Sequence, residues 1–151
     1  MSGGTERTRS TVSDATAAPT RVEPPLDRDI SEFWDGTRDQ RLLIPTCRSC
    51  GEAFWYPRPT CPHCLSADID WNESSGAGEV AAVSVMHRPA NPLMADKVPY
   101  AVVLVDLDTP RVRLMSNMVD VDATDVRVGM RVQLRWEALS DGRNLWLFAP
   151  A

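Results

Sequence analysis

From residue 79 onward, apolar and polar residues alternate in short runs, as they do in β-strands that bury one face. The pattern predicts five strands with no long helix between them: Glu79–Met86, Tyr100–Leu107, Val112–Val119, Arg131–Ala138 and Asn144–Ala149. Asp141-Gly142 is typical of a hairpin turn between the last two strands. Five strands over about 75 residues predict a small closed or partly open β-barrel, for which the OB fold is the best-known architecture.

Helical periodicity is found near the start of the chain, where apolar residues fall at i, i+4, i+7 and i+8. These residues are Leu26, Ile30, Phe33 and Trp34. Asp27 or Asp29 can cap the start of the helix, and Asp35-Gly36 can end it. The aromatic face predicts either packing against the chain's own domain or docking on a partner protein, and the periodicity does not choose between them.

All four cysteines lie in two Cys-x-x-Cys pairs, Cys47/Cys50 and Cys61/Cys64, with ten residues between the pairs. Four thiolates suit a tetrahedral Zn²⁺ ion with Zn–S bonds of about 2.3 Å. Four ligands leave no open coordination position, so the pattern predicts one structural zinc ion per chain. Iron and two disulfide bonds are the alternatives, although disulfides fit a secreted chain better and no secretory signal precedes the pairs.

Three short apolar segments around the cysteines are predicted to form a small sheet, which together with the metal would be a rubredoxin-like zinc ribbon. The segments are Arg41–Pro45, Ala53–Pro57 and Ile69–Trp71. Their aromatic residues exceed what so small a module can bury, which favours contact with a further surface: Phe54, Trp55, Tyr56 and Trp71. His63 lies inside the second pair and is expected on the surface of the knuckle rather than among the ligands.

The composition narrows the possible partners. The net charge is −5, Lys97 is the single lysine, and no cluster of basic residues is present, which argues against a nucleic-acid-binding protein. No apolar run reaches the roughly 18 residues of a membrane span. Reduced thiols without an export signal predict a cytoplasmic protein. Residues 1–24 are mostly small, polar or charged, which predicts a disordered tail.

A long loop with three prolines, residues 87–99, joins the first two barrel strands. Long loops on barrels often carry function. His87 could act as an acid–base group, but no serine or cysteine nucleophile accompanies it. We therefore expect His87 and Arg88 to shape the loop or to face a ligand.

Taken in order, these features resemble the DUF35 family of zinc-ribbon and OB-fold proteins. The resemblance extends from about Leu26 to Pro150, and the ordered series is specific although each motif is weak alone. The series comprises Phe33-Trp34, Cys47-x-x-Cys50-Gly51, Pro57-Arg58-Pro59, Cys61-Pro62-x-Cys64, Ser75-Gly76-x-Gly78-x-Val80, Val98-Pro99-Tyr100 and Val128-Gly129-Met130-x-Val132. With it, the mostly β chain divides into a tail (1–24), an N-terminal helix and lead-in (25–42), a zinc ribbon (43–73) and a five-stranded OB-fold domain (74–151).

The resemblance implies a non-catalytic accessory subunit of a thiolase-superfamily enzyme, either a thiolase or an aldolase, that acts on acyl-CoA in lipid or steroid side-chain degradation. The thiolase-like partner would carry the catalytic residues in a two-plus-two heterotetramer. The aromatic helix face would contact this partner, and His87 and Arg88 would face the CoA ester. A nucleic-acid-binding OB module with a zinc ribbon and an independent enzyme are the alternatives. The negative charge disfavours the first, and the lack of nucleophile motifs disfavours the second.

Overall fold

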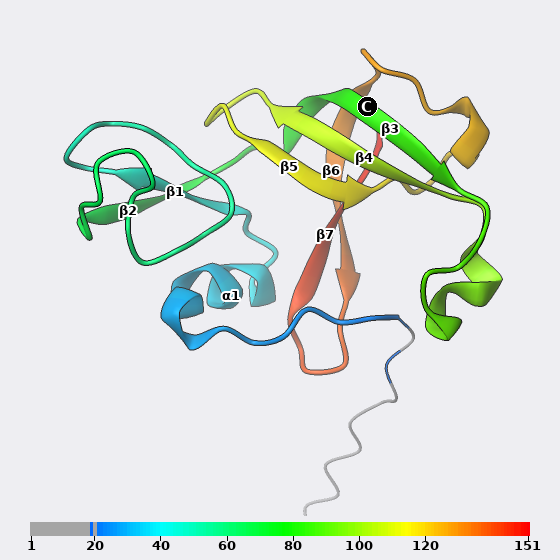
Figure 1. Ribbon diagram of the computed structural model, residues 1–151, viewed down its shortest axis with the longest axis horizontal. Helices are drawn as coiled ribbons and strands as arrows, with labels where there is room; N and C mark the ends of the chain where they lie inside the picture. Colours follow the sequence, from blue (N-terminus) through cyan, green and yellow to red (C-terminus); the bar gives the residue numbers. More distant parts are fainter. Residues whose placement is uncertain (1–18, 20) are drawn as a thin grey trace, which may run out of the picture.

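The computed structural model describes residue 19 and residues 21–151. A 3₁₀ turn, η1 (Arg28–Ile30), runs directly into the helix α1 (Ser31–Arg38). A two-stranded sheet follows, made of β1 (Leu43–Cys47) and β2 (Ile69–Glu73). The second sheet contains β3 (Ala77–Met86), β4 (Tyr100–Leu107), β5 (Arg113–Asn117), β6 (Arg131–Ala138) and β7 (Asn144–Pro150), with the 3₁₀ turns η2 (Pro92–Lys97) and η3 (Ala123–Asp125) in its loops. The two sheets lie side by side, with α1 next to their junction (Figure 1).

The five-stranded sheet curls into a nearly closed barrel. Its strand order is β5-β4-β3-β6-β7, and every neighbouring pair is antiparallel. The two edge strands meet through a single parallel bridge between Met118 and Phe148, where the N–H of Val119 donates to the C=O of Phe148 at 2.8 Å. This is the topology of an OB fold, so the predicted fold class and all five predicted strands are confirmed.

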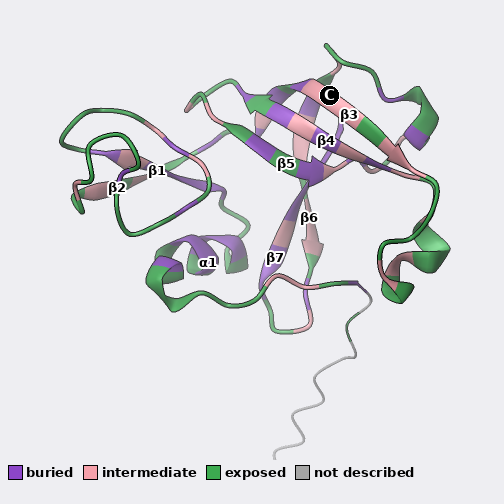
Figure 2. Cartoon of the chain, in the orientation of Figure 1, coloured by how far each residue is buried: buried purple, intermediate pink, exposed green. Residues whose placement is uncertain are grey.

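Alternation along the strands decides which side chains fill the barrel. On β4, every second residue is buried: Ala101, Val103, Val105 and Leu107. Figure 2 shows the same alternation of buried and more exposed positions on the strands of the barrel. Val80 of β3, Val132 of β6 and Phe148 of β7 complete this core and have no exposed surface. The strand period therefore produces a packed barrel interior rather than an internal cavity for a ligand.

The N-terminal helix does not end where the sequence predicts. It continues through Asp35-Gly36 to Arg38, because Gly36 allows the side chain of Leu43 to pack against the helix. A Cβ atom at Gly36 would lie only 2.7 Å from Cδ1 of Leu43. The chain then turns at Gln40, which has a φ of 56°. No helix within the described residues is long and apolar enough to span a membrane.

The aromatic face of this helix is buried in the chain's own core. Ile30, Phe33 and Trp34 are at most 1% exposed, so these three side chains offer no surface to a partner, contrary to the docking prediction. The Phe33 ring lies 5.6 Å from Trp55 of the ribbon and 5.4 Å from Trp146 of β7, centroid to centroid. The helix thus joins the ribbon to the barrel through one aromatic cluster, and Leu26, outside the helix and 54% exposed, alone remains accessible.

The ribbon contains two of the three strands that the sequence predicts. The predicted strand at Ala53–Pro57 is wrong, because only Ala53 pairs, in a single bridge with Thr46. Beyond Ala53 the chain leaves the sheet, and this departure carries the Trp55 ring to the aromatic cluster. Packing of a large ring against the helix and barrel therefore overrides the local strand preference.

Residues 21–24 form a strap across the hairpin between β6 and β7. The guanidinium of Arg21 donates to Glu137 at 3.1 Å, and the backbone N–H of Ser140 donates to the carboxylate of Glu23 at 2.8 Å. The predicted disordered tail therefore does not hold for these four residues. The rest of that prediction concerns residues 1–18 and 20, which lie outside the described residues, and residue 19.

Replacing Gly76 by alanine is expected to lower the free energy of unfolding by about 3 kcal/mol. Gly76 has a φ of +73°, and an added Cβ would lie 2.3 Å from Cβ of Leu134, which the strand holds in place. Gly129→Ala is the matched control, because its φ is +86° but no atom lies within 4 Å of the new Cβ. In the control, the free energy of unfolding should fall by only about 1–2 kcal/mol, which is the cost of holding an alanine in the left-handed backbone conformation. Urea denaturation measures both, and equal losses would contradict the role of the Leu134 contact.

Candidate metal centre and apolar surface

Each cysteine pair is carried by a knuckle with the same backbone geometry. In the first knuckle the N–H of Gly51 donates to the C=O of Cys47 at 2.8 Å, and in the second the N–H of Leu65 donates to the C=O of Cys61 at 2.9 Å. Both donor residues have left-handed backbones, with a φ of 78° at Gly51 and 64° at Leu65. Glycine adopts this conformation without a Cβ clash, whereas Leu65 adopts it as an exposed leucine, at a position the sequence did not single out.

The knuckles bring the four sulfur atoms together, all within 4.8 Å of one another. The Sγ atoms of Cys47 and Cys64 are 3.5 Å apart, and those of Cys50 and Cys61 are 3.7 Å apart. Sulfurs at the corners of a tetrahedral zinc site with bonds of about 2.3 Å are roughly 3.8 Å from one another. A disulfide would need about 2.05 Å, so the four thiols fit one metal ion and not two disulfides.

The thiols differ in acidity within this cluster. Burial opposes ionisation of Cys47, but hydrogen bonds from the backbone of Cys50 and from the Cys64 thiol lower the pKa of Cys47 to about 6. At Cys50 a hydrogen bond from the backbone of Glu52 favours the thiolate, yet desolvation and the neighbouring thiols outweigh it and raise the pKa of Cys50 to about 12. Several thiolates so close together repel one another, so full deprotonation requires a bound cation.

The two histidines and the arginine that the sequence singled out lie on the surface, His63 on the ribbon and His87 and Arg88 on the barrel. His63 is exposed, and the cluster of potential metal ligands consists of the four cysteines without it. His87 and Arg88 are exposed at the start of the loop that follows β3. Their predicted contact with a CoA ester stays a prediction.

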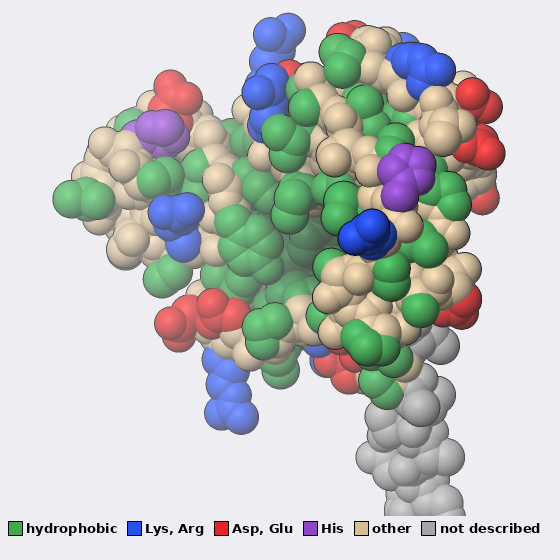
Figure 3. Space-filling model, turned by 45° about the vertical axis from the view of Figure 1, so that its right-hand side comes forward, with side chains coloured by type: hydrophobic (Ala, Val, Ile, Leu, Met, Phe, Trp, Pro, Cys, Tyr) green, Lys and Arg blue, Asp and Glu red, His purple; other side chains and the backbone are tan. Residues whose placement is uncertain are grey.

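An apolar hollow lies between the ribbon and the barrel, where hydrophobic side chains gather on the surface (Figure 3). We define it by Trp55 and Tyr56 on the ribbon side and Met115 and Trp146 on the barrel side. Tyr56 is 39% exposed and Met115 is 64% exposed. Trp146 links the two sides, because its ring lies 5.5 Å from that of Trp55 and its Nε1–H donates to the C=O of Met115 at 3.2 Å. Sequence patterns missed this surface, since its residues are far apart along the chain.

The outer face of β4 and β5 is the surface on which OB barrels bind single-stranded nucleic acids. In this chain it presents aliphatic side chains, including Val102, Leu104 and Met115. Arg113 is engaged there by two hydrogen bonds to Asp106, at 2.7 and 2.8 Å, so it contributes no free positive charge. Among the described residues of β4 and β5, Tyr100 is the one aromatic residue on this face, so the surface is mainly apolar.

Two family models match adjacent parts of the chain. The rubredoxin-like zinc ribbon domain of ChsH2 matches residues 34–70, and the C-terminal OB-fold domain of ChsH2 matches residues 71–137. These matches cover the metal cluster and most of the barrel. The prediction of a zinc ribbon with one structural zinc ion is confirmed by this match together with the clustered cysteines.

The chain is also similar to a much longer protein and to a protein of about its own length. A probable enoyl-CoA hydratase alpha subunit from Thermomonospora curvata is 36% identical over 131 residues, which are 87% of this chain and 40% of that protein. The chain thus spans less than half of that relative. A DUF35 domain-containing scaffold protein from Pyrococcus furiosus is 29% identical over 105 residues, or 70% of this chain and 76% of that protein.

Solved structures with the same fold include a chain of the Ltp2-ChsH2(DUF35) aldolase. It matches with a TM-score of 0.74 and 35% identity, and the match covers 85% of this chain and 98% of that chain. A DUF35-family protein of unknown function from Sulfolobus solfataricus matches with a TM-score of 0.54 and 17% identity, over 80% of this chain and 84% of that chain. The second match concerns the fold alone.

Proposed function

Because the chain belongs to the DUF35 family, we propose that it is a non-catalytic subunit of a thiolase-superfamily enzyme, a thiolase or an aldolase, that acts on acyl-CoA. One observation carries the proposal: the chain matches 98% of a solved chain of the Ltp2-ChsH2(DUF35) aldolase at 35% identity. The name of the Thermomonospora curvata relative, a probable enoyl-CoA hydratase alpha subunit, supports an acyl-CoA context.

The side chains support a role without catalysis. All four cysteines belong to the metal cluster, so none remains as a nucleophile. Four sulfur ligands leave no coordination position for a substrate, so the zinc ion would stabilise the ribbon and would not activate water. Both histidines are exposed on the surface. The reacting groups would therefore come from the thiolase-like partner.

In this proposal the apolar hollow replaces the buried helix face as the surface that contacts the partner. A partly exposed ring at Tyr56 and a mostly exposed thioether at Met115 provide the apolar area that a protein interface buries. The absence of lysine from the hollow agrees with the composition of interface centres. Leu26 adds to this contact in the proposal, because it is exposed just before the turn η1 that leads into α1.

The proposed complex contains two copies of each chain, and the acyl-CoA substrate reaches the partner's active site past this chain. A thiolase-like homodimer that binds one copy of this chain on each subunit would form a two-plus-two assembly. Arg88 would approach the CoA ester as a cation at the mouth of the path, with His87 next to it. The CoA ester of a fatty acid or a steroid side chain is the substrate class that this arrangement serves.

We expect the chain and a thiolase-like subunit from the same genome to co-purify as a two-plus-two complex when they are produced together. Met115→Asp should weaken the complex tenfold or more, because association would bury a new carboxylate without a partner. Val128→Asp is the matched control, because Val128 is also 64% exposed but lies in the turn before β6. Light scattering after gel filtration measures the mass of each assembly.

Two results would count against the proposal. If the unmodified chains elute separately at micromolar concentration, the partnership itself fails. If they form the complex but Met115→Asp and Val128→Asp behave alike, the partnership stands and the apolar hollow is not the contact surface.

A further inference from the structure

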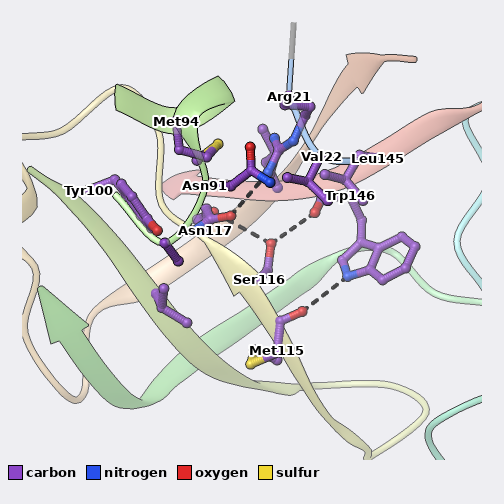
Figure 4. A pocket seen from close by; sticks show the side chains of 13 residues that line it. Arg21, Val22, Asn91, Met94, Tyr100, Met115, Ser116, Asn117, Leu145 and Trp146 are labelled. Atoms are coloured by element: carbon purple, nitrogen blue, oxygen red, sulfur yellow. Dashed lines mark hydrogen bonds between the residues drawn. The ribbon is translucent and has the colours of Figure 1, made fainter. Parts of the chain in front are cut away.

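A cavity lies at the open seam of the barrel, away from the metal cluster, and it shares Met115 and Trp146 with the apolar hollow. It has a volume of about 300 Å³ and is bounded by the strap, η2 and the strands β4, β5 and β7 (Figure 4). The seam arises because β5 and β7 are not joined by a full ladder. Side chains bridge it instead: Ser116 Oγ donates to the C=O of Trp146 at 2.8 Å, and Trp146 Nε1–H donates to the C=O of Met115.

Most of the cavity wall is apolar. Val102 and Met115 come from the outer face of β4 and β5, Met94 comes from η2, and Leu145 and Leu147 come from β7. The two methionine side chains are unbranched and can adapt to the shape of a bound chain. At roughly 30 Å³ for each water-sized group, the cavity has room for about ten non-hydrogen atoms, which is at the small end of ligand pockets.

One end of the cavity is polar and carries a buried cation. Arg21 is only 9% exposed, and its guanidinium donates to Asn117 at 3.3 Å and to Glu137 at 3.1 Å. Its Nε–H is buried without a hydrogen-bond partner among the described residues. Figure 4 shows Arg21 and Asn117 meeting at the cavity, with Met94 and Tyr100 beside them.

The charge at this end is unbalanced. A smaller adjoining space of about 190 Å³ is lined by Arg21, Lys97 and Glu137, and the Lys97 ammonium lies 3.7 Å from Glu137. Two cations therefore share one carboxylate, which leaves one positive charge for an anionic group of a ligand.

We propose that this seam cavity binds a medium-chain aliphatic carboxylate of about ten carbons. The ten carbons fill the seam cavity along the apolar wall between β4, η2 and β7, and the two carboxylate oxygens reach the adjoining space, where they accept hydrogen bonds at the Arg21–Lys97 end. Charge-assisted hydrogen bonds to a buried guanidinium favour a carboxylate over an uncharged head group. The cavity shares Met115 and Trp146 with the proposed partner surface, but its ligand contacts all come from this chain, so binding is tested on the chain alone and does not rest on the proposed partnership.

The test is isothermal titration calorimetry of the zinc-loaded full chain with decanoate, decanol and decanoyl-CoA. Decanoate and decanoyl-CoA are kept below their critical micelle concentrations, and decanol is kept below its solubility limit. We expect decanoate to bind about tenfold or more tightly than decanol, because the alcohol cannot neutralise the surplus charge. Decanoyl-CoA should resemble decanol or bind more weakly, since its thioester carries no charge at the end of the chain. In a ¹⁵N NMR spectrum, decanoate should shift the indole N–H signal of Trp146, which a Trp146→Phe variant identifies.

Variants locate the site and keep the test decisive. Arg21→Met should remove the preference for decanoate over decanol, and Lys97→Met, at a more exposed cation, should reduce it. Arg111→Met is the matched control: this exposed arginine lies beyond the other end of β4 and should change nothing. Val102→Trp fills the cavity and should weaken decanoate at least tenfold. Equal affinity for decanoate and decanol, or undiminished binding to Val102→Trp, would overturn the proposal.

Discussion

Replacing Cys61 by serine is expected to abolish zinc binding and to unfold the ribbon. Cys61 has no exposed surface, and its Sγ lies 3.7 Å from that of Cys50. The ribbon's own core cluster is small and consists of the buried residues Cys47, Phe54 and Cys61 with Ile69 packed against them. Structural zinc contributes about 10–16 kcal/mol to the folding of small zinc modules, so loss of one thiolate removes more stability than this core supplies.

The effect should be largest in the ribbon and smaller in the barrel. Ile44 of β1 and Leu42 before it belong to the main core, so unfolding of the ribbon will also loosen the packing around α1. Elemental analysis should show about one zinc per unmodified chain and almost none in Cys61→Ser. Hydrogen exchange should rise throughout residues 43–73 and less in β4 and β6.

His63→Ser is the matched control for this experiment. His63 lies between the two cysteines of the same knuckle, is exposed, and is outside the cluster of four ligands. It should therefore retain the zinc ion and the exchange pattern of the unmodified chain. Retention of zinc by Cys61→Ser, or its loss from His63→Ser, would contradict the four-cysteine site.

Trp34→Ala is expected to lower the free energy of unfolding by about 3–5 kcal/mol, the usual loss when a buried tryptophan is truncated. Trp34 is 1% exposed and contacts Phe33 and Trp146, with ring centroids 5.0 and 6.2 Å away. The guanidinium carbon of Arg143 lies 4.5 Å from the centre of the Trp34 ring. Truncation would thus leave both a cavity and a buried cation that has lost its aromatic contact.

Leu26→Ala is the matched control, because the sequence places Leu26 and Trp34 on one apolar face but only Trp34 is buried. Leu26 is 54% exposed, so its truncation should change stability by no more than about 0.5 kcal/mol. Urea denaturation of the zinc-loaded proteins measures both. If both variants keep full stability and Trp34→Ala instead loses the partner complex, then the helix face is an interface after all.

Some features followed from the sequence because they depend on local spacing. Two residues between paired cysteines are enough to form a knuckle, so the four ligands and the zinc ion could be identified from Cys47 to Cys64 alone. Strands such as Tyr100–Leu107 were recognised with their observed bounds, because alternation is a property of neighbouring residues. The order of knuckles, glycines and strands also identified the family, which the comparisons confirm.

Only the tertiary structure decided which surface each apolar face packs against. Periodicity states that Phe33 and Trp34 share a face, but not whether that face meets the chain's own barrel or another protein. Trp55 lies outside any strand, although the sequence predicts one at Ala53–Pro57, because the contact of its ring with distant Trp146 outweighs the local preference.

The strap and the seam cavity depend on contacts between distant parts of the chain, which the sequence pattern does not reveal. Arg21 stands in a polar stretch whose composition predicts disorder, yet hydrogen bonds to Glu137 and Asn117, about a hundred residues later, hold it in place. Composition records how little apolar surface a segment can bury, and it contains no information about acceptors that another part of the chain provides. The sequence by itself therefore determined the metal centre and the strands, whereas closure of the barrel and docking of the strap decided which surfaces remain open to a partner or a ligand.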